Sequence, residues 1–364
     1  MINRAQRRTF DATPGSAHEL VVGLVPSGAR VLELGCATGY MSEVLAKRLG
    51  CAVTGLELFP EAAAVAREHC QRVFVGDAET FDFERALGRE RFDVVLFADV
   101  LEHLREPEAV LRRIRPLLVE GGAAVASVPN VAHASVRLAL LGGEFRYGQT
   151  GLLDRTHLRF FTRESIEDLF QGAGFSITHW SRRRLGVEES EIAPPAREVP
   201  AAVRGWLAAD PEATTYQFVV RASPSERAAT DLQSRLRARE AEDAERWTER
   251  VARAARELAG LVPSGARLIL IDDDRIRGAL GPAHEVVPFP ERGGQYGGPP
   301  ADDDSAIAEL ERLRERGALF AVVAWPAFWW LEYYAGLARH LRARYRQVSE
   351  GERFIVFELR AGHG

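Results

Sequence analysis

The chain has 364 residues, of which 46% are hydrophobic and 27% are charged. This is the composition of an ordinary globular protein, and the length is sufficient for two domains. The formal net charge of -5 excludes a bulk electrostatic attraction to nucleic acid or to an anionic membrane surface. We therefore expect no nucleic-acid partner.

Cysteine use and apolar runs indicate the cellular compartment. Cys36, Cys51 and Cys70 are odd in number and lack the spacing of a zinc site, which favours reduced thiols. The charged N-terminus is followed by no apolar run of the kind that a signal peptide requires. The longest apolar stretch, 318–331, contains Pro326 and is shorter than the roughly 20 residues of a membrane-spanning helix. We expect a cytoplasmic protein without a membrane span.

The segment 30–39, RVLELGCATG, is the most informative part of the sequence. Its first five residues form a short apolar run that is typical of a buried parallel strand. The turn Gly35-x-Ala37-x-Gly39 then leads into a helical pattern over 40–49. Small residues let the backbone of such a turn approach a ligand, and the N–H groups of the new helix face that ligand. The spacing differs from the dinucleotide fingerprint Gly-x-Gly-x-x-Gly.

The alternation of strand and helix continues through the first half of the chain. Four further apolar runs and two helical patterns follow, with strands at 51–56, 72–75, 91–97 and 123–128 and helices at 60–70 and 107–118. We expect Gly121-Gly122 to end the second of these helices. Such alternation predicts an α/β fold with a doubly wound parallel sheet, whose ligand lies at the carboxyl ends of the strands.

Acidic residues stand at the ends of three of these strands. Glu57 ends the second strand about 20 positions after Gly35, where a carboxylate can accept both hydroxyls of a ribose. The alternative for Glu57 is a solvated charge at a strand end. Asp77 follows the third strand, where it can also act as a helix N-cap, and Asp99 follows the fourth.

Together these features resemble the class I S-adenosylmethionine (SAM) methyltransferases, with Ala37 where that family often has a glycine. The resemblance covers about residues 15–222 and implies SAM as the cofactor, bound by a seven-stranded Rossmann-like sheet. It also implies that Asp77 meets the adenine amino group and that the backbone N–H of Ala78 meets a ring nitrogen. The cofactor-binding residues that we expect are Glu33, Gly35, Cys36, Ala37, Gly39, Glu57, Leu58, Asp77, Ala78 and Asp99.

The last two strands of such a sheet are expected at 174–180 and 215–221, the final one antiparallel to its neighbours. Between them lies a segment rich in Pro and Glu, 188–200, which we interpret as a surface loop or lid. Before them, Thr162 is a predicted N-cap of a helix that continues to Gly172.

A second motif, Asp-x-x-Glu-His, lies just after the fourth strand. Asp99, Glu102 and His103 have the i, i+3 and i+4 spacing that places residues on one face of a helix. Ubiquinone-pathway O-methyltransferases and small-RNA 2′-O-methyltransferases have a similar Glu-x-x-Glu-His motif, which binds a divalent metal, and the latter add a second histidine. His157 resembles that histidine in position, so the implied ligands of Mg or Mn are Asp99, Glu102, His103 and His157. The alternative is a common helix start without a metal.

The polar group Asp154, His157 and Arg159 supplies the expected catalytic residues. A hydroxyl acceptor needs a base within hydrogen-bond reach, and we expect His157 to be that base, or a ligand if a metal is present. Asp154 would orient it, and Arg159 would hold the acceptor. The alternative is a structural network that ties down a loop.

These observations predict a SAM-dependent O-methyltransferase that acts on a hydroxyl of a sugar in a cell-envelope glycan or glycosylated metabolite. The resemblance extends to methyltransferase domains of bacterial polysaccharide clusters. Two alternatives are methylation of an RNA 2′-hydroxyl, which the acidic composition disfavours, and a non-catalytic scaffold with a vestigial SAM fold.

The remainder of the chain divides the protein into three parts, 1–222, 223–260 and 261–364. The first is the SAM-binding domain, and the second is a long charged helix, broken once at most, which is a candidate homodimer arm. The third is a smaller α/β domain. It begins with LVPSGAR at 261–267, a repeat of 24–30, but Asp272-Asp273-Asp274 replaces the small-residue turn.

An aromatic run follows in the third part, and it comprises Trp325, Phe328, Trp329, Trp330, Tyr333 and Tyr334. The favoured interpretation is core packing of a helix. The alternative is a platform on which sugar rings stack.

Overall fold

The computed structural model describes residues 9–192 and 199–360, which form two compact units divided between Leu236 and Arg237. Part of the expected lid, 193–198, lies outside the described residues. Within the described ranges, no helix is long and apolar enough to cross a bilayer.

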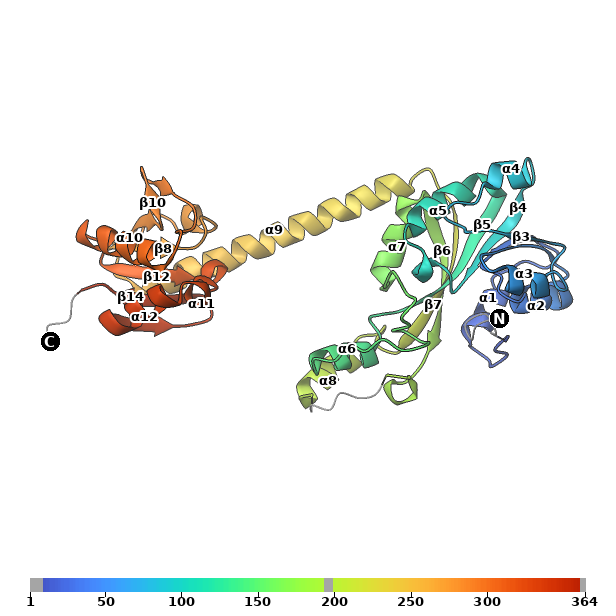
Figure 1. Ribbon diagram of the computed structural model, residues 1–364, viewed down its shortest axis with the longest axis horizontal. Coiled ribbons are helices and arrows are strands. Elements are labelled where there is room, and N and C mark those ends of the chain that lie inside the picture. The colour runs from blue at the N-terminus through green and yellow to red at the C-terminus, as the bar shows by residue number, and fades with distance from the viewer. Residues whose placement is uncertain (1–8, 193–198, 361–364) are drawn as a thin grey trace. The chain divides into compact units, whose positions relative to one another are not determined.

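The N-terminal unit is built on a seven-stranded sheet in the order β3-β2-β1-β4-β5-β7-β6 (Figure 1). Strands β1 to β5 are parallel, and β7 is antiparallel to both β5 and β6, as predicted. The strands are β1 (Arg30–Leu34), β2 (Ala52–Glu57), β3 (Arg72–Val75), β4 (Phe92–Ala98), β5 (Leu118–Pro129), β6 (Phe175–Arg184) and β7 (Thr215–Pro224).

Helices cover both faces of this sheet because successive strand residues point to opposite sides. On one face Val31 and Val94 pack with Met41 and Leu45 of the second helix. On the other, Leu32 and Val95 share a core with residues of the fourth, fifth and seventh helices. The helices are α1 (Ala17–Val22), α2 (Tyr40–Leu49), α3 (Pro60–Ala66), α4 (Phe83–Leu87), α5 (Pro107–Ile114), α6 (Ala134–Leu141), α7 (Arg163–Gly172) and α8 (Ala201–Ala208).

The prediction that Gly121-Gly122 ends a helix is wrong. Helix α5 ends at Ile114, and a 3-10 turn over Arg115–Leu117 leads directly into β5. A proline at the second position of that turn cannot donate the hydrogen bond that would continue an α-helix. The glycines instead lie inside β5, where the pairing with β4 shifts register between Phe92 and Val94.

The prediction of a capped helix after Thr162 is confirmed. The Thr162 hydroxyl accepts from the backbone N–H of Ser165 at the start of α7, and the two residues form a reciprocal capping box. Helix α8 was not predicted; it begins directly after the segment 188–200 that we interpreted as a loop.

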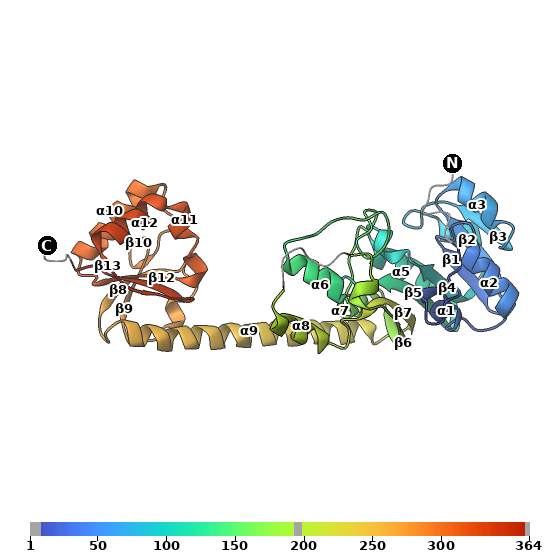
Figure 2. The same cartoon turned by 90° about the horizontal axis from the view of Figure 1, so that it is seen from below.

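The C-terminal unit is a five-stranded sheet in the order β13-β14-β12-β8-β9. Helices α10 and α12 pack on one face of it, and the part of α9 that belongs to this unit packs on the other (Figure 2). Helix α9 is continuous, which agrees with the prediction of a long helix with at most one break. The elements are α9 (Ala228–Leu261), β8 (Arg267–Ile271), β9 (Glu285–Pro288), β10 (Glu291–Arg292), β11 (Gln295–Tyr296), α10 (Asp303–Glu315), β12 (Phe320–Ala324), α11 (Trp330–Tyr333), α12 (Ala335–Arg344), β13 (Arg346–Glu350) and β14 (Phe354–Glu358).

The repeated heptapeptide forms the same turn in both units. Gly28 and Gly265 have φ values of 73° and 76°, and each donates its N–H to a carbonyl of the segment that precedes the neighbouring strand. Each turn leads into an interior strand of its sheet, β1 or β8. The units therefore begin alike and differ at the loop that follows this strand.

Gly55 of β2 lies against the turn that follows β1, and this contact yields a first prediction. A Cβ at Gly55 would lie 2.7 Å from Cys36 Sγ, so Gly55→Ala should lower the free energy of unfolding by about 1–3 kcal/mol. The measurement is hydrogen exchange of the β1 and β2 amides. When Gly55→Ala is combined with Cys36→Ala, the new methyl group should lower the free energy of unfolding by less, because the clashing sulfur is absent.

Gly205 provides the matched control. It lies inside α8 with no atom near its missing Cβ, so Gly205→Ala should raise stability by roughly 0.5–1 kcal/mol. Equal effects of the two alanines would contradict the packing argument.

Candidate active site

A pocket of about 500 Å³ opens at the carboxyl ends of β1, β2 and β4. Its walls include seven of the ten residues expected to bind a cofactor. These are Gly35, Ala37, Glu57, Leu58, Asp77, Ala78 and Asp99. The location agrees with the rule that ligands of open α/β sheets bind beyond the carboxyl ends of the strands.

Glu57 connects the turn after β1 to the end of β2. Its Oε2 accepts a 2.8 Å hydrogen bond from the backbone N–H of Ala37, and its Oε1 accepts one of 3.0 Å from Phe59. The side chain is 5% exposed, so these charge-assisted bonds hold the carboxylate at the pocket wall. The remaining lone pairs of both oxygens are available to donors on a ligand.

The turn itself requires an unusual backbone. Gly35 and Ala37 have φ values of 68° and 48°. A Cβ at Gly35 would also lie 2.8 Å from Cγ2 of Val100, so the close approach of the backbone to the pocket requires glycine there. Ala37 adopts the left-handed conformation despite its Cβ, and the bond from its N–H to Glu57 supports it.

Three expected cofactor residues, Glu33, Cys36 and Gly39, lie behind the pocket wall. The Glu33 carboxylate is 1% exposed and accepts a hydrogen bond from Ser42. Burial raises the pKa of Glu33 to about 8. Cys36 is fully buried against β2. These three residues therefore support the turn and do not line the pocket.

Asp99 does not share a helical face with Glu102 and His103, which corrects that expectation. Only Leu101–His103 is helical, as a single 3-10 turn, and Asp99 has a φ of 55°. Its Oδ1 accepts hydrogen bonds from Ser127 Oγ at 2.6 Å and from Gln217 Nε2 at 2.9 Å. The left-handed backbone thus directs this carboxylate to β5 and β7, at the pocket wall.

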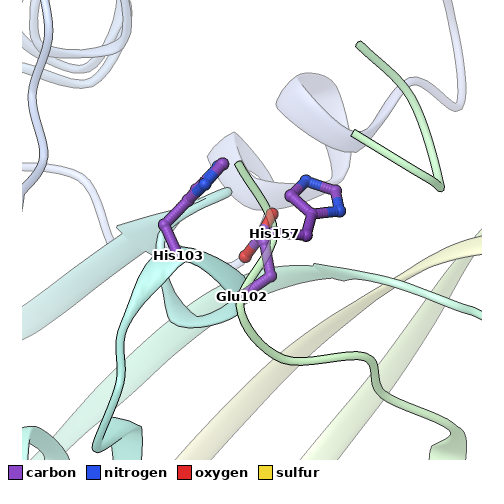
Figure 3. A group of neighbouring side chains, drawn as sticks. All are labelled: Glu102, His103 and His157. Atoms are coloured by element: carbon purple, nitrogen blue, oxygen red, sulfur yellow. The ribbon is translucent and has the colours of Figure 1, made fainter. Parts of the chain in front are cut away.

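Glu102, His103 and His157 form a compact group from two distant segments, as Figure 3 shows. One ligand atom from each lies within 4.8 Å of the others. The carbonyl oxygen of Glu102 accepts from the N–H groups of Leu158 and Arg159, at 2.8 and 3.0 Å. These backbone bonds place His157 beside the 3-10 turn.

Hydrogen bonds determine which nitrogen each imidazole presents. Nδ1 of His103 lies 3.1 Å from the carbonyl oxygen of Thr156, and Nδ1 of His157 lies 3.3 Å from that of Leu152. A carbonyl only accepts, so both Nδ1 atoms carry the proton. Each Nε2 therefore carries a lone pair, which can accept a proton or bind a metal.

The electrostatics of this group favour a neutral imidazole and an ionised carboxylate. Burial and the nearby His103 lower the pKa of His157, which is 7% exposed. Burial acts to raise the pKa of Asp154, but two hydrogen bonds from Thr156 outweigh it and the pKa is lowered. Asp154 and His103 line the pocket, and His157 packs against the His103 ring with centroids 4.9 Å apart.

Arg159, which was expected to hold the acceptor, is not among the residues that line the pocket. Its Nε donates to the carbonyl oxygen of Arg105 at 3.0 Å, and its guanidinium lies 3.5 Å from the Glu106 carboxylate. The backbone segment that carries Arg105, a pocket residue, is held by this contact.

Sequence reasoning missed several residues of the pocket wall. They are Tyr40, Leu56, Phe59, Gly76, Glu79, Ala98, Val100, Leu104, Arg105, Thr156 and Leu158. Most are direct neighbours of the motif residues, so proximity to the strand ends was the only available signal. Thr156 and Leu158 come from the segment around His157, which no local pattern places at this pocket.

Comparison with known proteins points to one family. A family model described as a methyltransferase domain matches residues 8–180. The ubiquinone biosynthesis O-methyltransferase of Cereibacter sphaeroides (strain ATCC 17025) is 36% identical over 151 residues, which cover 40% of this chain and 60% of that protein. Residues 8–180 therefore match a methyltransferase domain, and the two relatives named in this comparison are O-methyltransferases.

Other relatives of the methyltransferase domain extend over similar lengths. The enzyme of the same name from Xanthomonas axonopodis pv. citri is 38% identical over 125 residues, or 34% of this chain and 52% of that one. The chain thus spans 60% or less of the length of these two relatives. A solved SAM-dependent methyltransferase of Thermotoga maritima, described as a possible histamine N-methyltransferase, matches with a TM-score of 0.40 and 22% identity, over 57% of this chain and 87% of that one.

The buried acid below the methyltransferase turn yields a second prediction. Glu33 is protonated in both states below pH 4.5, but between 4.5 and about 8 only the unfolded chain ionises it. The free energy of unfolding should therefore fall as the pH rises through this window. Glu33→Gln removes the ionisation, so its stability relative to the wild type should increase over the same range. Urea unfolding at several pH values measures this, and parallel curves would contradict it.

Proposed function

We propose that the N-terminal unit transfers the methyl group of SAM to a hydroxyl oxygen. The observation that carries this proposal is the pocket itself, whose walls include the turn, Glu57 and His103, with His157 packed against the His103 ring. The relatives named O-methyltransferases support oxygen as the accepting atom. A methyl-transfer assay with labelled SAM is the direct test.

In this proposal the first three strand ends hold the nucleoside. The Glu57 carboxylate accepts the ribose hydroxyls with the lone pairs that Ala37 and Phe59 leave available. Asp77 accepts the adenine amino group and the N–H of Ala78 faces the ring. One Asp77 oxygen already accepts from the backbone N–H of Glu79 at 2.8 Å, which fixes the orientation of the carboxylate.

Transfer is an in-line displacement, so the residues must position the acceptor and remove its proton. The acceptor oxygen forms a bond to the methyl carbon as the carbon–sulfur bond breaks. The sulfonium leaves as a neutral thioether, and the hydroxyl proton passes to Nε2 of His157. The lowered pKa of His157 keeps this nitrogen unprotonated at neutral pH, and Asp154 stabilises the imidazolium that forms.

Glu102, His103 and His157 also fit a divalent metal, because one carboxylate and two imidazole lone pairs lie within 4.8 Å. These three residues would hold Mg or Mn, which would lower the pKa of the acceptor hydroxyl. Asp99 stands outside this group because its carboxylate bonds Ser127 and Gln217. A lone pair that binds a metal cannot take the proton, so the two roles of His157 exclude each other.

The acceptor that we propose is a sugar hydroxyl. Phe145 and Tyr147 are 42% and 56% exposed and pack on Phe160, whose ring centroid lies 6.3 Å from that of His157. Exposed rings of this kind suit the apolar face of a sugar. The names of the relatives favour a second candidate, a hydroxyl on a quinone-type ring, and the same aromatic residues would stack on it.

Removal of the proposed base yields a third prediction. His157→Ala should lower the rate of methyl transfer by about 10²–10⁴-fold, because the acceptor hydroxyl then keeps its proton. The affinity for S-adenosylhomocysteine, measured by calorimetry, should stay near the wild-type value. The exposed His179 of β6 is the matched control, and His179→Ala should retain full activity. Normal turnover of His157→Ala would exclude this residue from the mechanism.

A fourth prediction separates the two roles of His157. With this residue as the base, turnover should not change after exhaustive treatment with EDTA, and elemental analysis should find no bound metal. If activity is lost and then restored by Mg or Mn, His157 is instead a ligand together with Glu102 and His103.

A further inference from the structure

The C-terminal unit has a topological switch point at the carboxyl ends of β8 and β12. These strands are parallel neighbours, yet the chain leaves β8 toward β9 and leaves β12 toward β13 and β14 on the opposite side. Loops that diverge in this way leave a gap between them, which is where open α/β sheets bind ligands. The loop after β8 takes the place that the small-residue turn occupies in the N-terminal unit.

One carboxylate organises the side chains at these strand ends. Asp273, with a φ of 54°, accepts hydrogen bonds from both Trp329 Nε1 at 3.0 Å and Trp330 Nε1 at 2.9 Å. The hydroxyl of Tyr296 donates to the same group at 3.2 Å. Because the bond to Asp273 fixes the indole of Trp329, the orientation of this ring is set before any ligand binds.

The aromatic run divides into core residues and surface residues. Trp330 and Tyr334 are 0% and 3% exposed and belong to the core, as the favoured prediction stated. Trp329 and Tyr333 are instead 43% and 71% exposed, and their ring centroids lie 5.9 Å apart. Core packing therefore does not account for this pair, which presents two adjacent apolar faces to solvent.

The polar residues around the two rings decide which ligand class fits. Asp273 and Asp274 place negative charge here, which disfavours a phosphate or another anion. Asp274 pairs with Arg277 at 3.1 Å, so the rim offers both an acceptor and a donor to hydroxyl groups. Apolar ring faces beside such a rim match a sugar, which has flat C–H faces and hydroxyls at its edge.

We infer that a neutral pyranose sugar binds at Trp329 and Tyr333. The rim beside these two rings is formed by Asp273, Asp274 and Arg277. The rings of Trp329 and Tyr333 stack on the C–H faces of the sugar, and the rim bonds its hydroxyls. This binding involves residues of the C-terminal unit alone and does not require methyl transfer.

The test is a titration of the full-length protein with cellotetraose and with maltotetraose, followed by the indole N–H signals in NMR spectra. The Trp329 signal, assigned by its loss in Trp329→Phe, should shift on titration, whereas the Trp206 signal should not. Tyr333→Ala should weaken binding at least tenfold, and because this residue is mostly exposed the variant should fold normally. Trp206→Ala, a substitution of an exposed tryptophan on α8, should bind as the wild type does.

Three outcomes would overturn the inference. These are no shift with either sugar, shifts that persist in Tyr333→Ala, and a Trp329 shift caused by choline but by neither sugar, which would indicate a cation site. Calorimetry with S-adenosylhomocysteine on the same samples keeps the two proposals apart, because sugar binding should be independent of it.

Discussion

The bonds from Ala37 and Phe59 to the Glu57 carboxylate are the interaction on which the rest of the N-terminal site depends. They join the turn after β1 to the end of β2 and hold Ala37 in a left-handed conformation that alanine rarely adopts. A buried carboxylate that accepts two backbone N–H groups is held in one orientation. The same group thus supports the backbone and forms the pocket wall. A change at Glu57 would therefore alter both the backbone of the turn and the proposed binding of the ligand.

The other side of the site depends on backbone pairing between residues that are distant in the chain. The carbonyl oxygen of Glu102 accepts hydrogen bonds from the N–H groups of Leu158 and Arg159. These bonds bring His157 beside His103. Carbonyl oxygens of Thr156 and Leu152 then orient both rings. Because main-chain carbonyls orient both rings, the arrangement depends on the path of the backbone from Leu152 to Thr156 more than on the surrounding side chains.

The two units show how one starting element can lead to different surfaces. The same heptapeptide turn precedes β1 and β8. After β1, glycines allow the backbone itself to line a pocket. After β8, three aspartates follow, and Asp273 orients exposed aromatic side chains. A common sheet position therefore supports a backbone-lined pocket in one unit and a side-chain surface in the other.

The sequence alone was sufficient for the features that depend on neighbouring residues. The order of strands and helices, the turn at Gly35 to Gly39 and the acids at the strand ends follow from local periodicity, because a parallel sheet brings the carboxyl ends of its strands to one edge. The long helix α9 was evident for the same reason, since its pattern contains no proline.

Only the tertiary structure decided which of these residues meet. It separated Asp99 from Glu102 through one left-handed residue and placed Gly121-Gly122 inside a strand. It also joined His157 to His103 across a segment that contains α5, β5 and α6. It also distinguished Trp330 in the core from Trp329 at the surface, although the two are adjacent in the chain. These outcomes depend on backbone torsion, long-range hydrogen bonds and packing, and none of the three leaves a periodic signal in the sequence.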